Sequence, residues 1–146
     1  MEIRFATTEE EILQCLEVVQ ALRPHITGPE ELLQRIREMQ QEGYKLLYAA
    51  VEEDGQRKVV AIAGFRPLYK LHGGRTYYID DLSTLPGARG KGYGGQLLDH
   101  IHCLAWEDGK NVVELDSGYH RNDAHRLYLN KKYVLASHHF SFKVPR

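Results

Sequence analysis

The sequence has few cysteines and no long apolar run. Cys15 and Cys103 are its only cysteines, too few for a disulfide framework, so we expect core thiols inside helices of a reduced, cytoplasmic protein. No run approaches the roughly 18 apolar residues of a membrane span, and the first residues lack a signal-peptide profile. The formal net charge of −1 argues against general nucleic-acid binding, which depends on neutralising many phosphates.

The chain is expected to form one domain over residues 1–146, because no repeat or Pro/Ser-rich linker divides it. Its apolar residues alternate between the period of strands and the period of helices. The predicted order is β-α-α-β-β-β-α-β-α-β-β. The expected strands lie at 3–6, 45–52, 58–65, 77–85, 112–116, 133–136 and 139–144, and the expected helices near 8–24, 29–43, 96–107 and 123–130.

Short local signals mark several boundaries. Thr8 and Glu11 have the spacing of a capping box at the start of the first helix. Asp54-Gly55 is a hairpin turn signal, and the run at 59–63 looks buried on both faces. Pro86-Gly87 suits a type II turn after the fourth strand.

The most informative segment is a glycine-rich loop between a strand and a helix. Residues 89–95 read Arg-Gly-Lys-Gly-Tyr-Gly-Gly. A helix that begins in such a loop presents unpaired N–H groups at the positive end of its dipole, which is a ready anion site. The sequence therefore predicts a phosphate ligand.

Two known phosphate loops fit this segment poorly. A Walker A loop needs Ser or Thr directly after Gly-Lys, and Gly92 follows Lys91 here. The dinucleotide fingerprint matches formally at Gly90-x-Gly92-x-x-Gly95, with Asp116 at the end of the next strand. In that fold, however, the first glycine follows the strand directly, and antiparallel hairpins do not precede the loop.

The segment instead resembles a signature of the GCN5-related N-acetyltransferases (the GNAT family), which is Arg/Gln-x-x-Gly-x-Gly/Ala. A second match follows on the helix after the next strand, where Asn122-x-Ala124-x-x-x-Tyr128 is similar to that family's second signature. The resemblance covers the whole chain and implies an α/β single-domain fold of α+β type. It implies a mixed, mostly antiparallel sheet of six to seven strands flanked by about four helices.

The resemblance also implies acetyl-CoA as acyl donor, with no metal. By this implication the backbone of Leu82, Ser83 and Thr84 pairs with the pantetheine arm like an added strand. Asn122 contacts the pantetheine from the other side, and Tyr128 approaches the sulfur. The pyrophosphate is bound by Arg89, Gly90, Lys91, Gly92, Tyr93 and Gly94.

Tyr128 is the predicted general acid. Acetyl transfer to an amine needs a neutral nucleophile, a polarised carbonyl and a proton for the departing thiolate. A tyrosine with an ordinary pKa near 10 stays protonated at neutral pH and can donate that proton. One departure from the family lies nearby, because Lys132-Tyr133 stands where Gly-Phe is usual. We expect the helix to end at Asn130, which tolerates a left-handed conformation.

The general base is less well defined. Asp80 and Asp81 lie on the strand facing the cofactor, and strand alternation sends their side chains to opposite faces, so at most one points into the cleft. Asp81 is a candidate base, with a structural hydrogen bond as the alternative. His120 has a suitable ordinary pKa and is a second candidate, with an exposed loop residue as the alternative. Glu114 and a chain of waters also stay open.

The acceptor is an amine, and the sequence does not choose between small molecules and peptides. The resemblance implies that it binds between the first two helices and the strand of Asp80 and Asp81. Arg23, His25 and Arg66 are candidate wall residues that suit an acidic acceptor, although ordinary surface charges have the same pattern. A non-catalytic acyl-CoA sensor on the same fold is the alternative function. The apolar end of the chain leaves a homodimer open.

Overall fold

A five-stranded sheet forms the centre of residues 1–115 in the computed structural model, which describes all 146 residues. The chain divides into two units, residues 1–115 and 116–146. The strand order is β1-β2-β3-β4-β5, antiparallel except for the parallel pair of β4 and β5. The strands are β1 (Glu2–Phe5), β2 (Lys45–Glu53), β3 (Gln56–Lys70), β4 (Gly74–Thr84) and β5 (Val112–Leu115).

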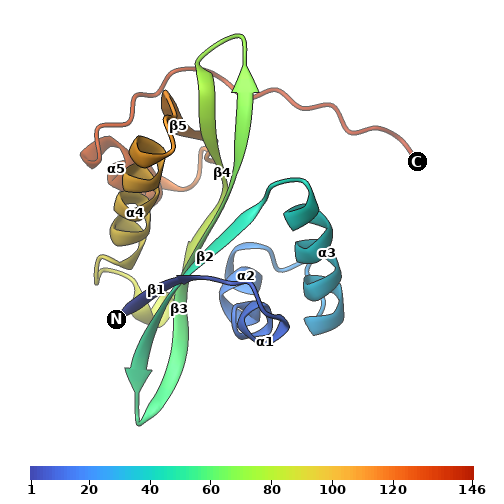
Figure 1. The fold of residues 1–146 in the computed structure, drawn as a ribbon, viewed down its shortest axis with the longest axis vertical. Helices are drawn as coiled ribbons and strands as arrows, with labels where there is room; N and C mark the ends of the chain where they lie inside the picture. The colour runs from blue at the N-terminus through green and yellow to red at the C-terminus, as the bar shows by residue number, and fades with distance from the viewer. The chain divides into compact units, whose positions relative to one another are not determined.

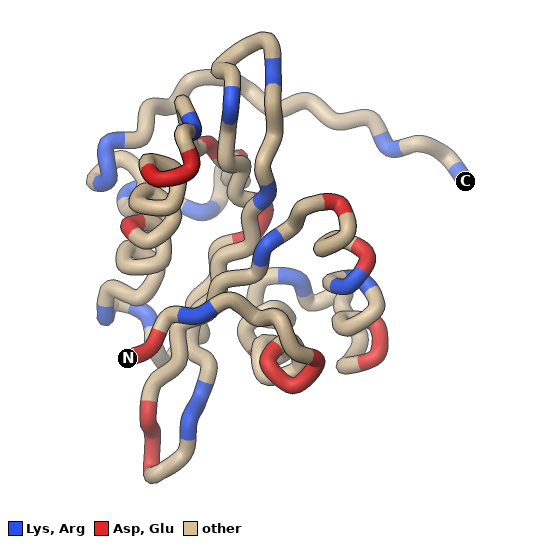
Figure 2. The backbone as a smooth tube through the Cα atoms, viewed as in Figure 1, with Lys and Arg blue, Asp and Glu red and all other residues tan.

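Helices cover both faces of this sheet. On one side lie α1 (Glu9–Gln14), α2 (Leu16–Leu22) and α3 (Pro29–Gln41), and on the other lies α4 (Tyr93–Glu107), as Figure 1 shows. The backbone trace in Figure 2 shows acidic residues gathered along α1 and α3. None of the helices combines the length and apolar content that a membrane span requires. The cytoplasmic location stays a prediction.

The predicted hairpin and buried strand are confirmed. Asp54 and Gly55 both have positive φ, at 52° and 76°, which is the geometry of a type I′ turn and joins β2 to β3. The run at 59–63 is at most 5% exposed, since helices pack on both faces of β3. The sheet therefore forms a rigid scaffold for the loop that follows β4.

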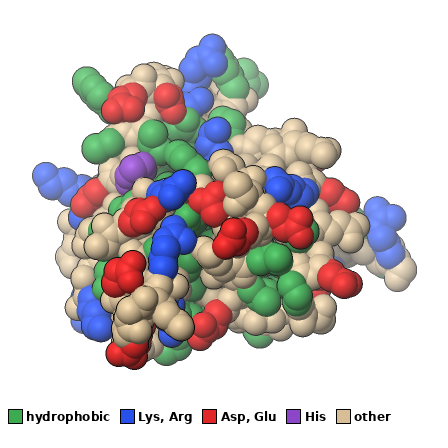
Figure 3. Space-filling model, turned by 60° about the horizontal axis from the view of Figure 1, so that its bottom comes forward, with side chains coloured by type: hydrophobic (Ala, Val, Ile, Leu, Met, Phe, Trp, Pro, Cys, Tyr) green, Lys and Arg blue, Asp and Glu red, His purple; other side chains and the backbone are tan.

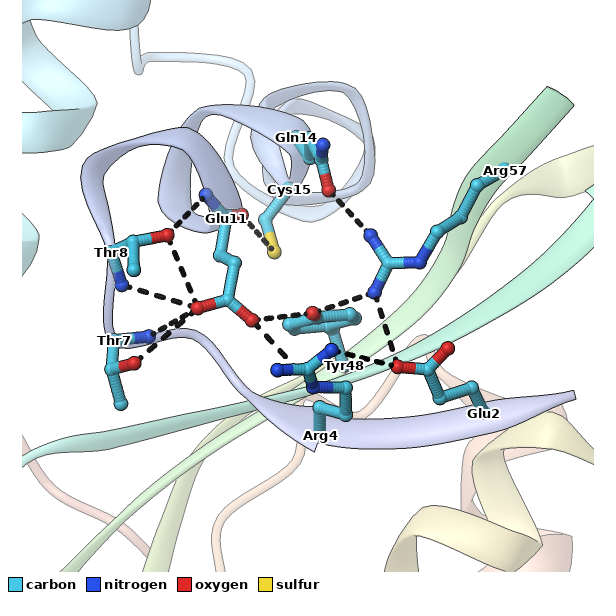
Figure 4. A network of polar contacts seen from close by, with 9 residues as sticks. All are labelled: Glu2, Arg4, Thr7, Thr8, Glu11, Gln14, Cys15, Tyr48 and Arg57. Atoms are coloured by element: carbon cyan, nitrogen blue, oxygen red, sulfur yellow. Dashed lines mark hydrogen bonds and ion pairs between the residues drawn. The ribbon is translucent and has the colours of Figure 1, made fainter.

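The capping box at the start of α1 is also confirmed, and it belongs to a larger network (Figure 4). Glu11 accepts hydrogen bonds from the Thr8 backbone N–H and, at 2.6 Å, from the Tyr48 hydroxyl. Arg57 donates to the Tyr48 hydroxyl at 2.7 Å. The hydrogen bond from Tyr48 is the main reason why the pKa of Glu11 falls from 4.5 to about 2. This network ties α1 to β2 and β3.

Some expectations about this unit were wrong. The expected single helix near 8–24 is broken at Cys15 into α1 and α2. Cys15 is buried as expected, but Cys103 is exposed, because it lies on the outer side of α4. Pro86 begins a short 3₁₀ helix (Pro86–Ala88) instead of a type II turn, since Gly87 does not adopt the positive φ that a type II turn requires.

In the second unit, α5 (Asn122–Asn130) forms close to its expected bounds. Lys132, and not Asn130, takes the left-handed conformation after the helix, with φ of 70°. The Tyr133 N–H then bonds the Tyr128 carbonyl at 3.0 Å, and the Lys132 N–H bonds the Leu129 carbonyl at 3.0 Å. These two bonds are those of a Schellman motif, so the position that the family gives to glycine keeps its geometry without one.

The two expected strands at 133–136 and 139–144 are not formed, and the sheet has five strands where six to seven were expected. An alternating pattern favours a strand, but a strand exists only where a neighbour supplies the ladder of hydrogen bonds. The apolar side chains of this segment are 63–90% exposed, namely those of Val134, Leu135, Phe140, Phe142 and Val144.

Candidate functional site

The glycine loop forms a left-handed turn at the start of a long helix. Gly90 and Gly92 have φ of 80° and 86°, and Gly92 is the N-cap of α4, which has no side-chain cap. The first N–H groups of α4 therefore have no partner within the helix. Arg89 and Lys91 are exposed beside them, and the Arg89 Nε–H donates to the Thr84 carbonyl at 3.3 Å. This arrangement suits an anion.

The end of β4 that leads into this loop has one open edge. Leu82, Ser83 and Thr84 pair with β3 on one side. On the other side, β5 pairs with β4 only from Thr76 to Ile79. The main chain beyond Ile79 has no strand on that side, so an extended ligand can add there as a strand does. The Ser83 hydroxyl donates to the Val18 carbonyl at 3.0 Å, which anchors this stretch to α2.

A bulge lies just before this open edge. Asp81 is opposite Gly64 and Ile79 is opposite Phe65, so Asp80 is an extra residue on β4. The expectation that Asp80 and Asp81 point to opposite faces was wrong, because the bulge interrupts strand alternation. Both carboxylates instead join one network.

This network is a closed ring of five residues, which we call the arginine–aspartate ring: Arg23, Tyr44, Arg66, Asp80 and Asp81. Arg23 donates from Nε to Asp81 Oδ1 and from Nη2 to the Asp80 carbonyl, both at 3.1 Å. The Tyr44 hydroxyl donates to Asp81 Oδ2 at 2.8 Å. Arg66 lies 5.3 Å over the Tyr44 ring and bonds Asp80 through Nε, at 3.0 Å to Oδ1. The Arg66 Nη2 lies 2.8 Å from Asp80 Oδ2.

The ring is well buried at Tyr44 and more open at its arginines. Burial, with the neighbouring Asp81 carboxylate, raises the pKa of Tyr44 well above its usual value, so it remains a proton donor. Burial also raises the pKa of Asp80, opposed by its bonds to Arg66. The Arg23 side chain is 41% exposed and that of Arg66 is 22% exposed. His25 lies exposed in the loop before α3.

Sequence reasoning missed Tyr44. A Cβ at Gly64 would lie 1.7 Å from the Tyr44 hydroxyl oxygen, so the glycine is what gives the Tyr44 ring its place over β3. An isolated glycine inside a strand pattern is a signal for such a close approach. Gly64 therefore predicts that some group approaches the strand closely at this position, but it does not predict that the group is Tyr44.

The second unit carries the other predicted site residues. Asn122 begins α5 and is exposed, and Tyr128 is partly buried. Burial raises the pKa of Tyr128, with the Arg121 charge opposing the shift. The Tyr128 ring centroid lies 5.9 Å from that of Tyr133. His120 is exposed, with its ring close to Gly118.

Three polar residues near the end of β5 have separate surroundings. Lys70 pairs with Glu114 across β4, so that carboxylate is engaged. Asp116 lies 3.3 Å from His139, measured from Oδ2 to Nδ1. The Ser117 hydroxyl is buried and has no hydrogen-bond partner, a feature that sequence reasoning also missed. No group of three or more His, Cys, Asp or Glu side chains is arranged to hold a metal ion.

The mostly antiparallel sheet and the glycine turn opening α4 together define an acetyltransferase fold rather than a dinucleotide-binding one. The model of the acetyltransferase (GNAT) family matches residues 11–131. The chain belongs to this family and is an N-acetyltransferase. The family uses acetyl-CoA as acyl donor.

Named relatives agree with this membership. The chain is 35% identical over 125 residues to the uncharacterized N-acetyltransferase YhdJ of Bacillus subtilis, covering 86% of this chain and 85% of YhdJ. It is 39% identical over 64 residues to the aminoalkylphosphonate N-acetyltransferase of Salmonella typhimurium, covering 44% of this chain and 40% of that protein.

Solved structures share the fold. An acetyltransferase from Trypanosoma brucei superposes with a TM-score of 0.80 at 20% identity, over 98% of this chain and 99% of that one. Glucosamine-6-phosphate N-acetyltransferase from Arabidopsis thaliana superposes with a TM-score of 0.78 at 19% identity, over 99% and 98%. The α/β fold with a mixed, mostly antiparallel sheet is thus confirmed.

Proposed function

We propose that this chain moves the acetyl group of acetyl-CoA to a primary amine by direct attack. The observation that carries the proposal is the open edge of β4, which leads through the short 3₁₀ helix Pro86–Ala88 into the glycine turn at the start of α4. An extended arm ending in a pyrophosphate matches that sequence of features. The anionic end meets unpaired N–H groups, and the arm meets unpaired strand groups.

The residues proposed to hold the donor are those that the family signatures mark. The Arg89–Gly94 segment binds the pyrophosphate, with Arg89 and Lys91 adding positive charge. The backbone of Leu82 to Thr84 pairs with the pantetheine arm, and Asn122 contacts it as well. No metal takes part in this proposal.

Tyr128 acts as the general acid. The neutral amine attacks the thioester carbonyl, the carbon–sulfur bond breaks, and the departing thiolate takes the Tyr128 proton. Burial raises the pKa of Tyr128, so the phenol is protonated at neutral pH and carries the proton that the thiolate takes. The proton lost by the amine goes to a base or to solvent.

Asp81 and His120 remain the two candidate bases. Both oxygens of Asp81 accept hydrogen bonds, from Arg23 and from Tyr44, so proton abstraction there requires one of these bonds to be given up. His120 carries no such restriction. The pH dependence of kcat/KM in Asp81→Asn and His120→Gln variants assigns the role, because loss of the base removes the acidic limb of the profile.

The acceptor is proposed to be a small amine. One relative acts, by its name, on aminoalkylphosphonates, which are primary amines of this kind. The oligomeric state is left to measurement, since the exposed apolar residues at 134–144 allow pairing with a second copy.

A thiol-release screen tests the proposal. The purified chain is incubated with acetyl-CoA and a library of primary amines, and free coenzyme A and the acetylated products are measured together. Amine-dependent release of one thiol per acetylated product is the expected result. Tight acetyl-CoA binding without turnover on any amine would favour the non-catalytic sensor instead.

A further inference from the structure

The arginine–aspartate ring leaves one edge of each guanidinium unused. Arg23 uses Nε and Nη2 to bind Asp81 and the Asp80 carbonyl, and Arg66 uses Nε and Nη2 to bind the Asp80 carboxylate. Each arginine therefore keeps its Nη1 group, with two N–H donors, outside these pairs. Both side chains retain exposed surface, 41% for Arg23 and 22% for Arg66.

Both guanidinium groups are anchored on the same residue, Asp80. Arg66 bonds its carboxylate and Arg23 bonds its main-chain carbonyl. Tyr44 completes the arginine–aspartate ring on the other side. The Arg66 guanidinium lies over its aromatic ring, and its hydroxyl donates a hydrogen bond to Asp81. Anchored arginines lose little side-chain entropy when they bind a ligand, so each of these guanidinium groups is preorganised to bind an anion.

The position of the arginine–aspartate ring on β4 puts it where the acceptor is expected to bind. It lies at the β4 bulge, directly before the open edge at Leu82 to Thr84. If the pyrophosphate lies at the loop and the arm runs back along β4, as proposed above, the thioester end faces Asp80 and Asp81.

We propose that Arg23 and Arg66 bind an anionic group of the acceptor, so that the preferred substrate is a small amine carrying a carboxylate or a phosphonate. This inference rests on the proposed function and narrows its acceptor class.

The charges of the ring favour this class over a purely cationic amine. Both carboxylates are already paired with arginines, so they offer little to an incoming ammonium group. The hydrogen-bonding groups that the arginines leave unused are all donors. A polyamine would meet these donors with no anion to accept from them, whereas an aminophosphonate or amino acid would satisfy them.

The test compares three amines of similar length: 2-aminoethylphosphonate, β-alanine and propylamine. Acetylation of each is measured as kcat/KM with the wild-type chain and with Arg23→Gln, Arg66→Gln and Arg35→Gln. Arg35 is the matched control, because it is an exposed arginine on α3 whose side chain pairs with Glu31 outside the ring.

The wild type is expected to prefer one or both anionic amines over propylamine by about ten- to hundredfold, the range of charge-assisted hydrogen bonds. Arg23→Gln and Arg66→Gln should each remove most of that ratio, and Arg35→Gln should keep it. The ratio between phosphonate and carboxylate tells which anion fits. If Arg23→Gln does not fold, Arg23→Lys replaces it. We expect Arg23→Lys to lose the same preference for anionic amines, since a lysine paired with Asp81 has no second nitrogen to donate to the anion.

Propylamine acetylated as well as the anionic amines would overturn the inference and leave the transferase function standing. An anion preference that survives both ring variants would overturn it as well. Failure of every amine in the larger screen would instead refute the proposed function itself.

Discussion

Replacement of Gly64 by alanine is predicted to disrupt the arginine–aspartate ring by displacing Tyr44. The added Cβ would lie 1.7 Å from the Tyr44 hydroxyl oxygen and 2.3 Å from its Cζ. These distances are far inside van der Waals contact, and the Tyr44 ring is held by Asp81 on one side and Arg66 on another. The ring of Tyr44 must therefore move.

The magnitude follows from what Tyr44 loses. Its side chain is 4% exposed, and loss of a buried aromatic side chain costs about 3–5 kcal/mol. Loss of its hydrogen bond to a charged carboxylate is included in that range at about 1.5–3 kcal/mol. Gly64 does not have positive φ, so alanine brings no backbone strain of its own. We expect Gly64→Ala to lower the free energy of unfolding by about 3 kcal/mol or more.

A double-mutant cycle measured by urea unfolding, followed by far-ultraviolet circular dichroism, isolates this clash. Tyr44→Ala alone should cost about as much as Gly64→Ala, and adding Gly64→Ala to Tyr44→Ala should cost less than about 0.5 kcal/mol. Additive losses, or a loss below about 1 kcal/mol for Gly64→Ala alone, would refute the packing that we describe.

Three further changes have separate expected outcomes. Lys132→Gly removes the cost of a left-handed lysine at φ of 70° and should raise stability by about 1 kcal/mol in thermal unfolding; a loss of stability would contradict the helix end. Gly92→Ala places a side chain at φ of 86°, so we expect a higher KM for acetyl-CoA and a free energy of unfolding that is lower by about 1–2 kcal/mol. An unchanged KM would argue against the turn as the anion site. The pKa of Glu11 is lowered from 4.5 to about 2, so Glu11 stabilises the fold above pH 4.5, and this contribution is lost as the pH falls toward 2. Glu11→Gln should therefore lower stability at neutral pH and flatten its dependence on pH between these values, and parallel pH curves for the two proteins would contradict the network of Figure 4.

Much of the scaffold was predictable because its signals are local. The Thr8–Glu11 capping box, the Asp54-Gly55 turn and the period of apolar residues each act within a few positions. Strand β3 runs past its predicted end at Phe65 and includes Pro67, a residue that argues against a strand. The structure explains this, since Lys45, the first residue of β2, lies opposite Phe65, and proline is tolerated on the edge of β3 that β2 leaves open beyond it.

The candidate site was predictable only where it is continuous in sequence. The glycine turn was found from its own residues, whereas the arginine–aspartate ring joins Arg23, Tyr44, Arg66 and the β4 bulge from separate elements. The bulge inserts one residue without a local sequence signal, and it reverses the expected direction of Asp80 relative to Asp81. The face in Figure 3 shows acidic and basic side chains close together, and composition alone does not tell which of them pair.

The turnover of Tyr128→Phe tests the central claim most directly. Wild type and variant are compared in the thiol-release assay with an accepted amine, and acetyl-CoA affinity is titrated separately. Tyr119→Phe serves as control, since Tyr119 is an exposed tyrosine of the same unit. Our account predicts that kcat falls about 10²–10⁴-fold in Tyr128→Phe, the range for a lost general acid, while the Kd for acetyl-CoA stays within about twofold, a change below about 0.5 kcal/mol. An unchanged kcat in Tyr128→Phe would contradict the account.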